Sequence, residues 1–290
     1  MTKRPYVIYA PYYSKSAGCR VLYKLGALLE EKGFQVYMYA PPSAEYKKCT
    51  YLSYREITDE LRQNAIIVYP EVVVGNPLQF QNVVRYVLYY PGLNGGTKTY
   101  HQSEAVYTFF EEYDPGFPVL FISTMDETLF YKDETPKTVD SYFVYKNGKW
   151  KEIPEFSKMV EINMKYPATR PELADLLHRT KNFYSYDAKT LLLNEAAACG
   201  CNVYIVTEDG FEPYTGYEEF LESVKGTDAQ LTDFIAHTQK MNYQGTPEPI
   251  RLSQKADWLK SKMKYYFYKY LLANATDAEK HYYLSNRYII

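Results

Sequence analysis

The pattern of hydrophobic and polar positions divides the first half of the chain into short apolar runs and longer amphipathic stretches. The short runs predict strands at 6–10, 34–39, 65–70, 106–110 and 119–123. Apolar positions that recur every three or four residues predict helices between them. The two predicted buried faces are Val21, Leu22, Leu25, Leu28 and Leu29, and, in a helix that begins at Asn76-Pro77, Val83, Val84, Val87 and Leu88.

A polar segment at 131–140 interrupts this alternation and is the predicted linker. Beyond it, strands are predicted at 141–145, 159–164, 182–186 and 202–206. Helices are predicted from the capping box Thr169-Arg-Pro-Glu172 and at 189–199, 217–225, 228–241 and 251–273. Strands separated by helices indicate parallel sheets, so the predicted class is α/β with two Rossmann-like domains that face a cleft.

Composition excludes several classes of protein. The 290 residues carry a net charge of -2, which argues against a broad electrostatic grip on nucleic acid. The four cysteines include no CxxC pair, which is typical of reduced core residues in a cytoplasmic protein. No apolar run approaches the length of a membrane span, and the start lacks a signal peptide. The 34 tyrosines are spread along the chain, so most are expected at half-buried packing positions.

The stretch YSYDAKTLLLNEAAACGCNVYIV, residues 184–206, carries the strongest candidate chemistry. Asp187 follows a predicted strand, and Glu195 lies in the helix that comes next. In open parallel sheets, ligands bind where strands end and helix N-termini present free N–H groups. A carboxylate there can accept hydrogen bonds from two ribose hydroxyls. The small residues after Glu195 allow the helix to pack closely on the sheet.

This stretch resembles a known signature. Asp187, seven further residues, Glu195 and then AAACGCNV are similar to the donor-binding motif of GT-B glycosyltransferases of the group-1, family-4-like type. TRPELADLLHRTKNFYSYD resembles the preceding helix and strand of bacterial polysaccharide-type members, and VIYAPYYSKSAGCRVLYKLGALLEEKG resembles their acceptor domain. The resemblance implies an acceptor-side domain at 1–135, a donor domain at 140–248, and C-terminal helices at 249–290 that pack back on the first domain.

The resemblance also implies residue roles. Glu195 matches the glutamate that binds the ribose, and Asp187 takes the place of the acid near the donor sugar. Glu71 follows the strand after which many relatives place a histidine. The implied catalytic residues are Glu71 and Asp187, and the implied donor-binding residues are Gly18, Lys146, Lys149, Tyr186, Asp187, Thr190 and Glu195. Lys146 and Lys149 are the candidates for the diphosphate.

The implied activity is transfer of a hexosyl group from a nucleotide-diphosphate sugar to a glycan or lipid-linked glycan hydroxyl in polysaccharide biosynthesis. The reaction would retain the anomeric configuration and use neither a metal nor a cofactor other than the sugar nucleotide. Two alternatives stay open: a sugar-nucleotide epimerase-like enzyme, and a non-catalytic nucleotide-sugar-binding scaffold protein. The lysines at 255–269 also leave open a peripheral contact with the inner face of the membrane.

Several residues have a simpler interpretation. Glu195 could form an ordinary salt bridge, and Asp187 could cap the helix predicted at 189. Lys146 and Lys149 flank Asn147-Gly148, a common hairpin-turn dipeptide. Gly18 could simply allow the backbone to make a tight strand-to-helix turn, with no role in binding.

The sequence contains no DxD motif, so lysines and helix N-termini are the expected partners of the leaving diphosphate. We therefore predict that sugar transfer survives EDTA. The initial rate of sugar transfer, measured with and without the chelator, tests this. Loss of turnover that Mn²⁺ restores would contradict the prediction.

Overall fold

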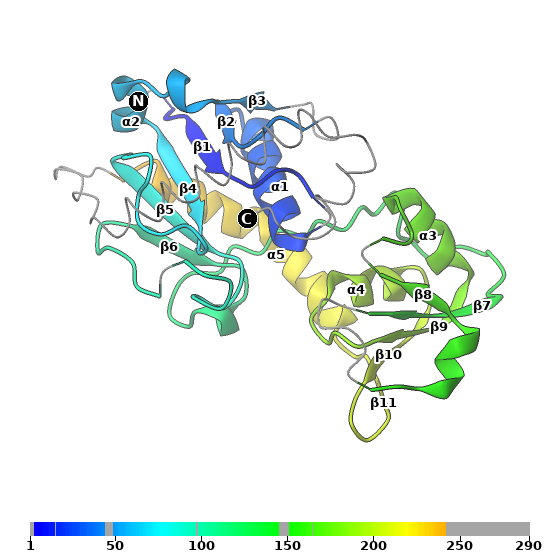
Figure 1. The fold of residues 1–290 in the computed structure, drawn as a ribbon. Helices are drawn as coiled ribbons and strands as arrows, with labels where there is room; N and C mark the ends of the chain where they lie inside the picture. The colour runs from blue at the N-terminus through cyan, green and yellow to red at the C-terminus, as the bar shows by residue number, and fades with distance from the viewer. Residues whose placement is uncertain are drawn as a thin grey trace, which may run out of the picture. The chain divides into compact units, whose positions relative to one another are not determined.

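The computed structural model describes residues 3–14, 16–43, 49–96, 98–144, 151–163 and 165–241 (Figure 1). Its contacts divide the chain into two compact units. Unit 1 combines the residues up to Thr124 with those from Gly226 onward, and unit 2 is Met125–Lys225. The predicted domain limits of 1–135, 140–248 and 249–290 stay predictions, and the last range lies outside the described residues.

Unit 1 contains a six-stranded sheet in the order β3-β2-β1-β4-β5-β6. Every pair of neighbours is parallel, with Tyr6 of β1 opposite Val36 of β2 and Ile66 of β4. The strands are β1 (Tyr6–Tyr9), β2 (Val36–Tyr39), β3 (Thr50–Tyr51), β4 (Ile66–Pro70), β5 (Asn82–Val87) and β6 (Ala105–Thr108). This order is that of Rossmann folds and reverses between β1 and β4.

One face of this sheet carries two helices, α1 (Ala17–Glu31) and the second half of α5 (Tyr217–Thr238). Leu22 and Leu25 of α1 and Phe234 of α5 belong to the same buried cluster as Tyr6 and Ile8 of β1. The other face is covered by loops, by the short helix α2 (Asp59–Asn64) and by side chains such as those at 78 and 80. Helix α5 is continuous, although the sequence predicts two separate helices there.

Two predicted elements of unit 1 are wrong. The segment after Asn76-Pro77 is the strand β5, not a helix, because its β-branched valines favour a strand. The side chain of Asn76 accepts hydrogen bonds from Tyr69 and the Phe80 N–H, which closes a loop instead of capping a helix. The segment at 119–123 is extended but makes only a single bridge, from Val119 to Thr108.

Unit 2 contains a five-stranded sheet in the order β11-β10-β9-β7-β8. All neighbours are parallel except β11, which runs antiparallel to β10. The strands are β7 (Val139–Phe143), β8 (Val160–Ile162), β9 (Thr180–Ser185), β10 (Asn202–Val206) and β11 (Phe211–Pro213). Both units are therefore α/β with parallel-dominated sheets, as predicted.

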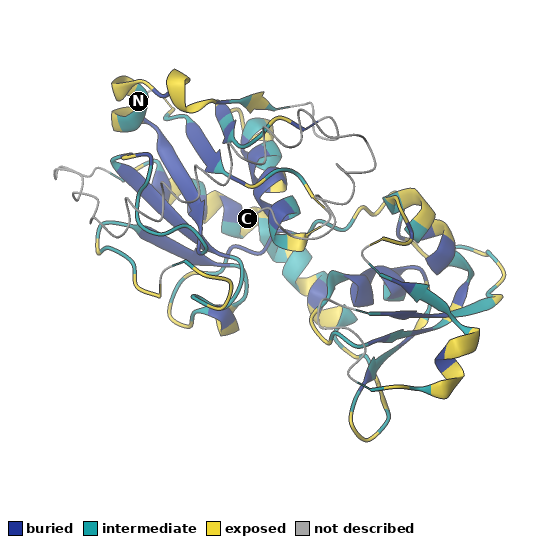
Figure 2. Ribbon diagram, viewed as in Figure 1, coloured by how far each residue is buried: buried dark blue, intermediate teal, exposed yellow. Residues whose placement is uncertain are grey.

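Helices α3 (Arg170–Arg179) and α4 (Leu191–Ala198) cover one face of this sheet. Leu177 of α3 and Leu193 of α4 are buried against Phe183 of β9. The predicted capping box is confirmed: Thr169 accepts from the Glu172 N–H, and Glu172 accepts from the Thr169 N–H. Among the described elements, the opposite face carries the 3₁₀ helix η3 (Pro154–Lys158) alone. Figure 2 accordingly shows half-buried positions along β9 and β10, whereas β4 and β5 are buried throughout.

Lys137 joins the C-terminal ends of both helices. Its Nζ donates to the carbonyl oxygen of Leu177 at 3.2 Å and to that of Cys199 at 2.7 Å. These carbonyls belong to the last turn of α3 and to the C-cap of α4, where the helix dipole favours a cation. Within the described part of the chain, no helix is both long and apolar enough to cross a membrane.

Replacing Lys137 by Met keeps the aliphatic stem and removes the charge that binds both helix ends. We expect unit 2 to lose about 1–3 kcal/mol, the usual cost of leaving such groups without a charged partner. Urea denaturation and hydrogen exchange in the last turns of α3 and α4 measure the effect. Lys225→Met, at an exposed pair with Glu222, is the control and should change little. Equal stability of the two variants would contradict the role of Lys137.

Candidate functional site

The carboxyl edge of the unit 1 sheet carries the first group of predicted site residues. Strand order reverses between β1 and β4, and ligands of open parallel sheets bind at such a reversal. Glu71 is the first residue after β4, so it lies at this point. The loop after β1 leads there to α1, and Tyr23 of α1 donates to the carbonyl oxygen of Pro11 in that loop.

Glu71 is a buried acid, only 4% exposed. Its Oε2 accepts a hydrogen bond of 2.9 Å from the N–H of Leu88, at the end of β5. Burial raises the pKa of the Glu71 carboxyl, and the hydrogen bonds and the Arg85 guanidinium offset this only in part. The result is a fixed carboxyl that takes up a proton more readily than an exposed one.

Arg85 of β5 holds the loop that follows Glu71. The fully buried guanidinium donates to the carbonyl oxygen of Val73 at 2.7 Å and to that of Gly75 at 2.9 Å. It also binds Glu104 through two hydrogen bonds, of 3.0 Å and 3.2 Å. The loop after β4, with Glu71 at its start, is thus preformed in the folded protein.

Gly96 lies in a glycine-containing loop that packs against the backbone of Glu71. Gly96 has a φ of +82°, and a Cβ placed on it would lie 2.1 Å from the carbonyl oxygen of Glu71. Because a backbone atom cannot yield as a flexible side chain does, only glycine fits this position. Gly96 therefore restricts where Glu71 can lie.

Gly18 lies in the first turn of α1, not in the loop before the helix. A Cβ on Gly18 would be in ordinary contact with the side chain of Leu88, at 3.7 Å. Leu88 is also the residue whose N–H binds Glu71. The structure thus places both Gly18 and Glu71 next to Leu88 at this edge.

The carboxyl edge of the unit 2 sheet carries the second group, in the connection from β9 to α4. Asp187 accepts at Oδ1 from the N–H of Lys189 at 2.9 Å, and its own N–H donates to the hydroxyl of Ser185. The N-cap of α4 is Thr190, whose hydroxyl accepts from Leu192, so Asp187 does not cap the helix. The Tyr186 hydroxyl donates to the carbonyl oxygen of Lys151 at 2.6 Å.

Glu195 lies in the second turn of α4 and is only 1% exposed. Both carboxylate oxygens accept from the guanidinium of Arg170, one at 2.9 Å and the other by a shorter contact. Arg170 lies in turn over the ring of Phe130, 4.4 Å from its centroid. Glu195 thus makes the salt bridge of the simpler interpretation, and its contact with a ribose stays a prediction.

Two predicted site residues, Lys146 and Lys149, lie outside the described residues.

The sequence patterns did not identify Arg170 and Arg85 as site residues, although each residue is unusual at its position. Arg170 is a cation at a helix N-terminus, where the dipole disfavours it, and Arg85 interrupts an apolar strand. Both anomalies indicate a buried partner.

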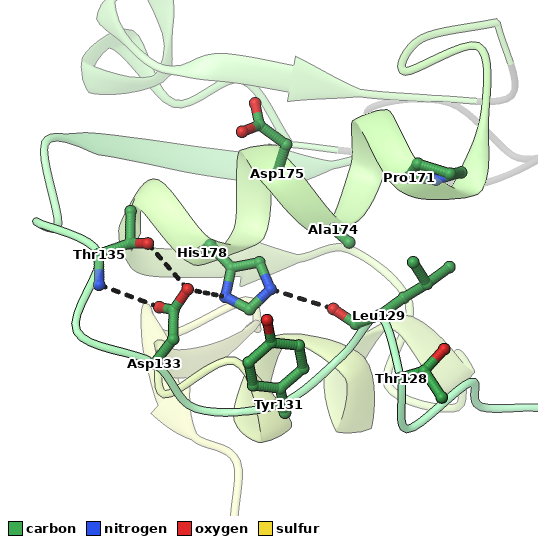
Figure 3. A pocket seen from close by; sticks show the side chains of 9 residues that line it. All are labelled: Thr128, Leu129, Tyr131, Asp133, Thr135, Pro171, Ala174, Asp175 and His178. Atoms are coloured by element: carbon green, nitrogen blue, oxygen red, sulfur yellow. Dashed lines mark hydrogen bonds and ion pairs between the residues drawn. The ribbon is translucent and has the colours of Figure 1, made fainter.

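A cavity of about 270 Å³ lies elsewhere in unit 2, between α3 and the segment 128–135 (Figure 3). His178 lines it, with Nε2 3.0 Å from the carbonyl oxygen of Leu129 and Nδ1 3.2 Å from Oδ2 of Asp133. A hydrogen bond from the Thr135 hydroxyl is the main cause that lowers the pKa of Asp133. The cavity contains none of the predicted site residues, and its His178 ties the linker segment to α3.

The described residues hold no group of three or more histidines, cysteines or acids that could bind a metal ion. No protein-family model matches the chain. No curated protein matches it either. Among solved structures, the chain is similar to a glycosyltransferase from Rickettsia africae ESF-5, with 10% identity, a TM-score of 0.43 and coverage of 95% of this chain and 100% of that chain. A similarity this low does not assign the chain to a family.

Replacing Arg170 by Ala leaves the buried Glu195 carboxylate without its cation. We expect unit 2 to lose about 3–5 kcal/mol, the usual cost of breaking a buried ion pair from one side. Arg179→Ala is the control, because that arginine at the other end of α3 binds Asp175 in an exposed pair worth less than about 1 kcal/mol. The double variant Arg170→Met, Glu195→Leu should recover part of the loss. Urea denaturation measures all three, and equal effects of Arg170→Ala and its control would contradict a structural role for the pair.

Proposed function

We propose that the protein is a glycosyltransferase that moves a hexosyl group from a nucleotide-diphosphate sugar to the hydroxyl of a glycan or lipid-linked glycan. The observation that carries the proposal is the position of Glu71. A buried carboxyl stands at the strand-order reversal of a Rossmann-type sheet, where ligands of this architecture bind. The donor-like signature around Asp187 and Glu195 in the second α/β unit supports it. The GT-B arrangement of the two units is part of the proposal.

The proposed reaction requires few groups from the protein. The bond from the anomeric carbon to the diphosphate breaks, a bond to the acceptor oxygen forms, and the acceptor hydroxyl loses its proton. Glu71 is the proposed acceptor of that proton, and Asp187 lies near the donor sugar. Helix N-termini and lysines, with Lys146 and Lys149 as candidates, stabilise the leaving charge without a metal. From the family resemblance we propose that the anomeric configuration is retained, and NMR of the product tests this.

A second candidate is a protein that binds a nucleotide sugar without turning it over. One observation favours it. Glu195 already gives both oxygens to Arg170, so a ribose could reach this carboxylate only by sharing or displacing the guanidinium. A cytoplasmic location and a peripheral membrane contact stay proposals in either case.

One experiment separates these candidates. A ligand that binds only the folded state raises the melting temperature, so UDP, GDP, dTDP and CMP sugars are screened by thermal shift. The best donor is then incubated with glycan acceptors, and free nucleotide diphosphate is measured. Binding followed by acceptor-dependent release supports the glycosyltransferase. Binding without release supports the second candidate, and no binding of any donor contradicts both.

Glu71→Gln preserves an acceptor for the Leu88 N–H and removes the proton acceptor. We expect transfer to fall by about 10²–10⁴-fold, the usual contribution of a general base, while donor binding is unchanged. Full activity of the variant would exclude Glu71 as the base.

The pH dependence follows from the raised pKa of Glu71. The base is ionised only above this pKa, so wild-type activity should rise with pH through a value above the ordinary 4.5. Because folding favours the protonated form, Glu71 should make wild-type stability decline as pH rises from 4.5 through the raised pKa. Urea denaturation across this range should show that Glu71→Gln lacks this part of the decline. Identical pH profiles of stability for the two proteins would contradict the burial effect.

A further inference from the structure

In the part of the chain that the structure describes, the unit 2 sheet presents a second face that α3 and α4 do not cover. Phe183 of β9 and Val203 of β10 point into the core beneath α3 and α4. Side chains alternate along a strand, so their neighbours point to the opposite face. On that face the register places Asn182 beside Asn202 and Tyr184 beside Tyr204.

Phe156 of η3 covers part of this second face. Its ring stacks on Tyr142 of β7, with centroids 4.7 Å apart, and lies 5.3 Å from Tyr184 and 5.9 Å from Phe211 of β11. Beside it, Tyr184 and Tyr204 are half-buried, and Phe211 is still 46% exposed. In parallel sheets both faces are usually covered, so these rings mark an open surface.

The open surface combines aromatic rings with fixed polar groups, and we call it the aromatic face. It consists of Asp140, Asn182, Tyr184, Asn202, Tyr204 and Phe211. The rings of Tyr184 and Tyr204 stack at 5.2 Å, and Phe211 lies 4.8 Å from Tyr184. This packing restrains the rings before any ligand arrives, which lowers the entropy cost of binding.

The polar groups of the aromatic face are also preorganised. Oδ1 of Asp140 accepts from the N–H and from the side-chain amide of Asn182, both at 3.0 Å. Oδ1 of Asn182 accepts from the amide of Asn202 at 3.0 Å. Among the described residues, four side-chain groups of this face have no hydrogen-bond partner: Oδ2 of Asp140, Oδ1 of Asn202 and the hydroxyls of Tyr184 and Tyr204. Acceptors and hydroxyl donors thus line the rings.

We infer that the aromatic face binds a neutral carbohydrate chain, namely the growing glycan acceptor. Sugar rings present apolar C–H surfaces to aromatic side chains and hydroxyls to amides and carboxylates. An apolar protein partner would bury these polar groups without hydrogen bonds, which is costly. An anionic polymer would meet the carboxylate of Asp140 and no cation of the aromatic face. A neutral polyhydroxyl ligand fits both the rings and the charge.

This inference deepens the proposed function and rests on it for the identity of the glycan as acceptor. Binding alone can be tested without activity. The full chain is run in native gels that contain dextran, galactomannan, soluble starch or, as an acidic polymer, polygalacturonate. We expect at least one neutral polymer to retard the protein. Phe211→Ser and Tyr204→Ser should weaken this binding about tenfold, which corresponds to about 1.4 kcal/mol.

One control and one further variant keep the test decisive. Tyr166→Ser removes a tyrosine of the same unit that is 51% exposed and lies outside the aromatic face, and it should bind as the wild type does. Asn202→Ala leaves the ring packing intact and should also weaken binding. The inference is overturned if no neutral polymer retards the protein, or if the variants match the wild type. It is equally overturned if only polygalacturonate retards the protein, or if Phe211→Ser instead dissolves a dimer in light scattering.

Transfer assays then separate this inference from the proposed function. Variants of the aromatic face should raise KM for a long glycan and leave kcat and transfer to a disaccharide unchanged. A protein that is retarded by a neutral polymer but never transfers a sugar would refute the proposed function alone. A protein that transfers a sugar while its variants keep the wild-type KM for long glycans would refute the inference alone.

Discussion

In each unit, a carboxylate held at both oxygens by one arginine joins segments that lie apart in the sequence. Arg85 and Glu104 hold the loop after β4, and Arg170 and Glu195 join the first turn of α3 to α4. Desolvating such charges is costly, so they persist inside a protein only when the geometry satisfies both partners. This requirement fixes the segments that each pair joins. The candidate residues at the sheet edges, Glu71 above all, therefore occupy defined positions before a ligand binds.

In the described residues of both units, the longer helices cover one face of each sheet, and the opposite faces carry the short helices α2 and η3. Aromatic side chains lie on these opposite faces among aliphatic ones, such as Tyr9, Tyr39 and Tyr69 in unit 1. Tyrosine suits such a position because its ring packs on the sheet while its hydroxyl finds a polar partner, as that of Tyr69 does in Asn76. This architecture gives several of the described tyrosines a packing role on the sheets.

The sequence predicted most elements of both sheets, because apolar periodicity and capping signals reflect local physics. It predicted a helix where β5 lies, since Asn76-Pro77 resembles a helix start and a valine run has no decisive period. For the site, it placed Glu71 and Asp187 at strand ends, where the structure has them. It did not reveal that Arg170 binds Glu195, because those residues lie 25 positions apart and no local pattern joins them. Long-range ion pairs leave only an anomaly, such as a cation at a helix start.

Helix α5 has a consequence for how the chain reaches its native state. Unit 1 is discontinuous, since Phe234 of α5 packs against Tyr6 and Tyr107, and Thr238 hydrogen-bonds to Tyr6. On the ribosome, domains generally fold as they emerge, beginning at the N-terminus. Here the first 124 residues must wait for α5, whereas unit 2 is contiguous and complete before α5 has fully emerged. Unit 2, in the middle of the chain, is therefore the part that can fold first, and the first sheet stays incomplete until α5 has been made.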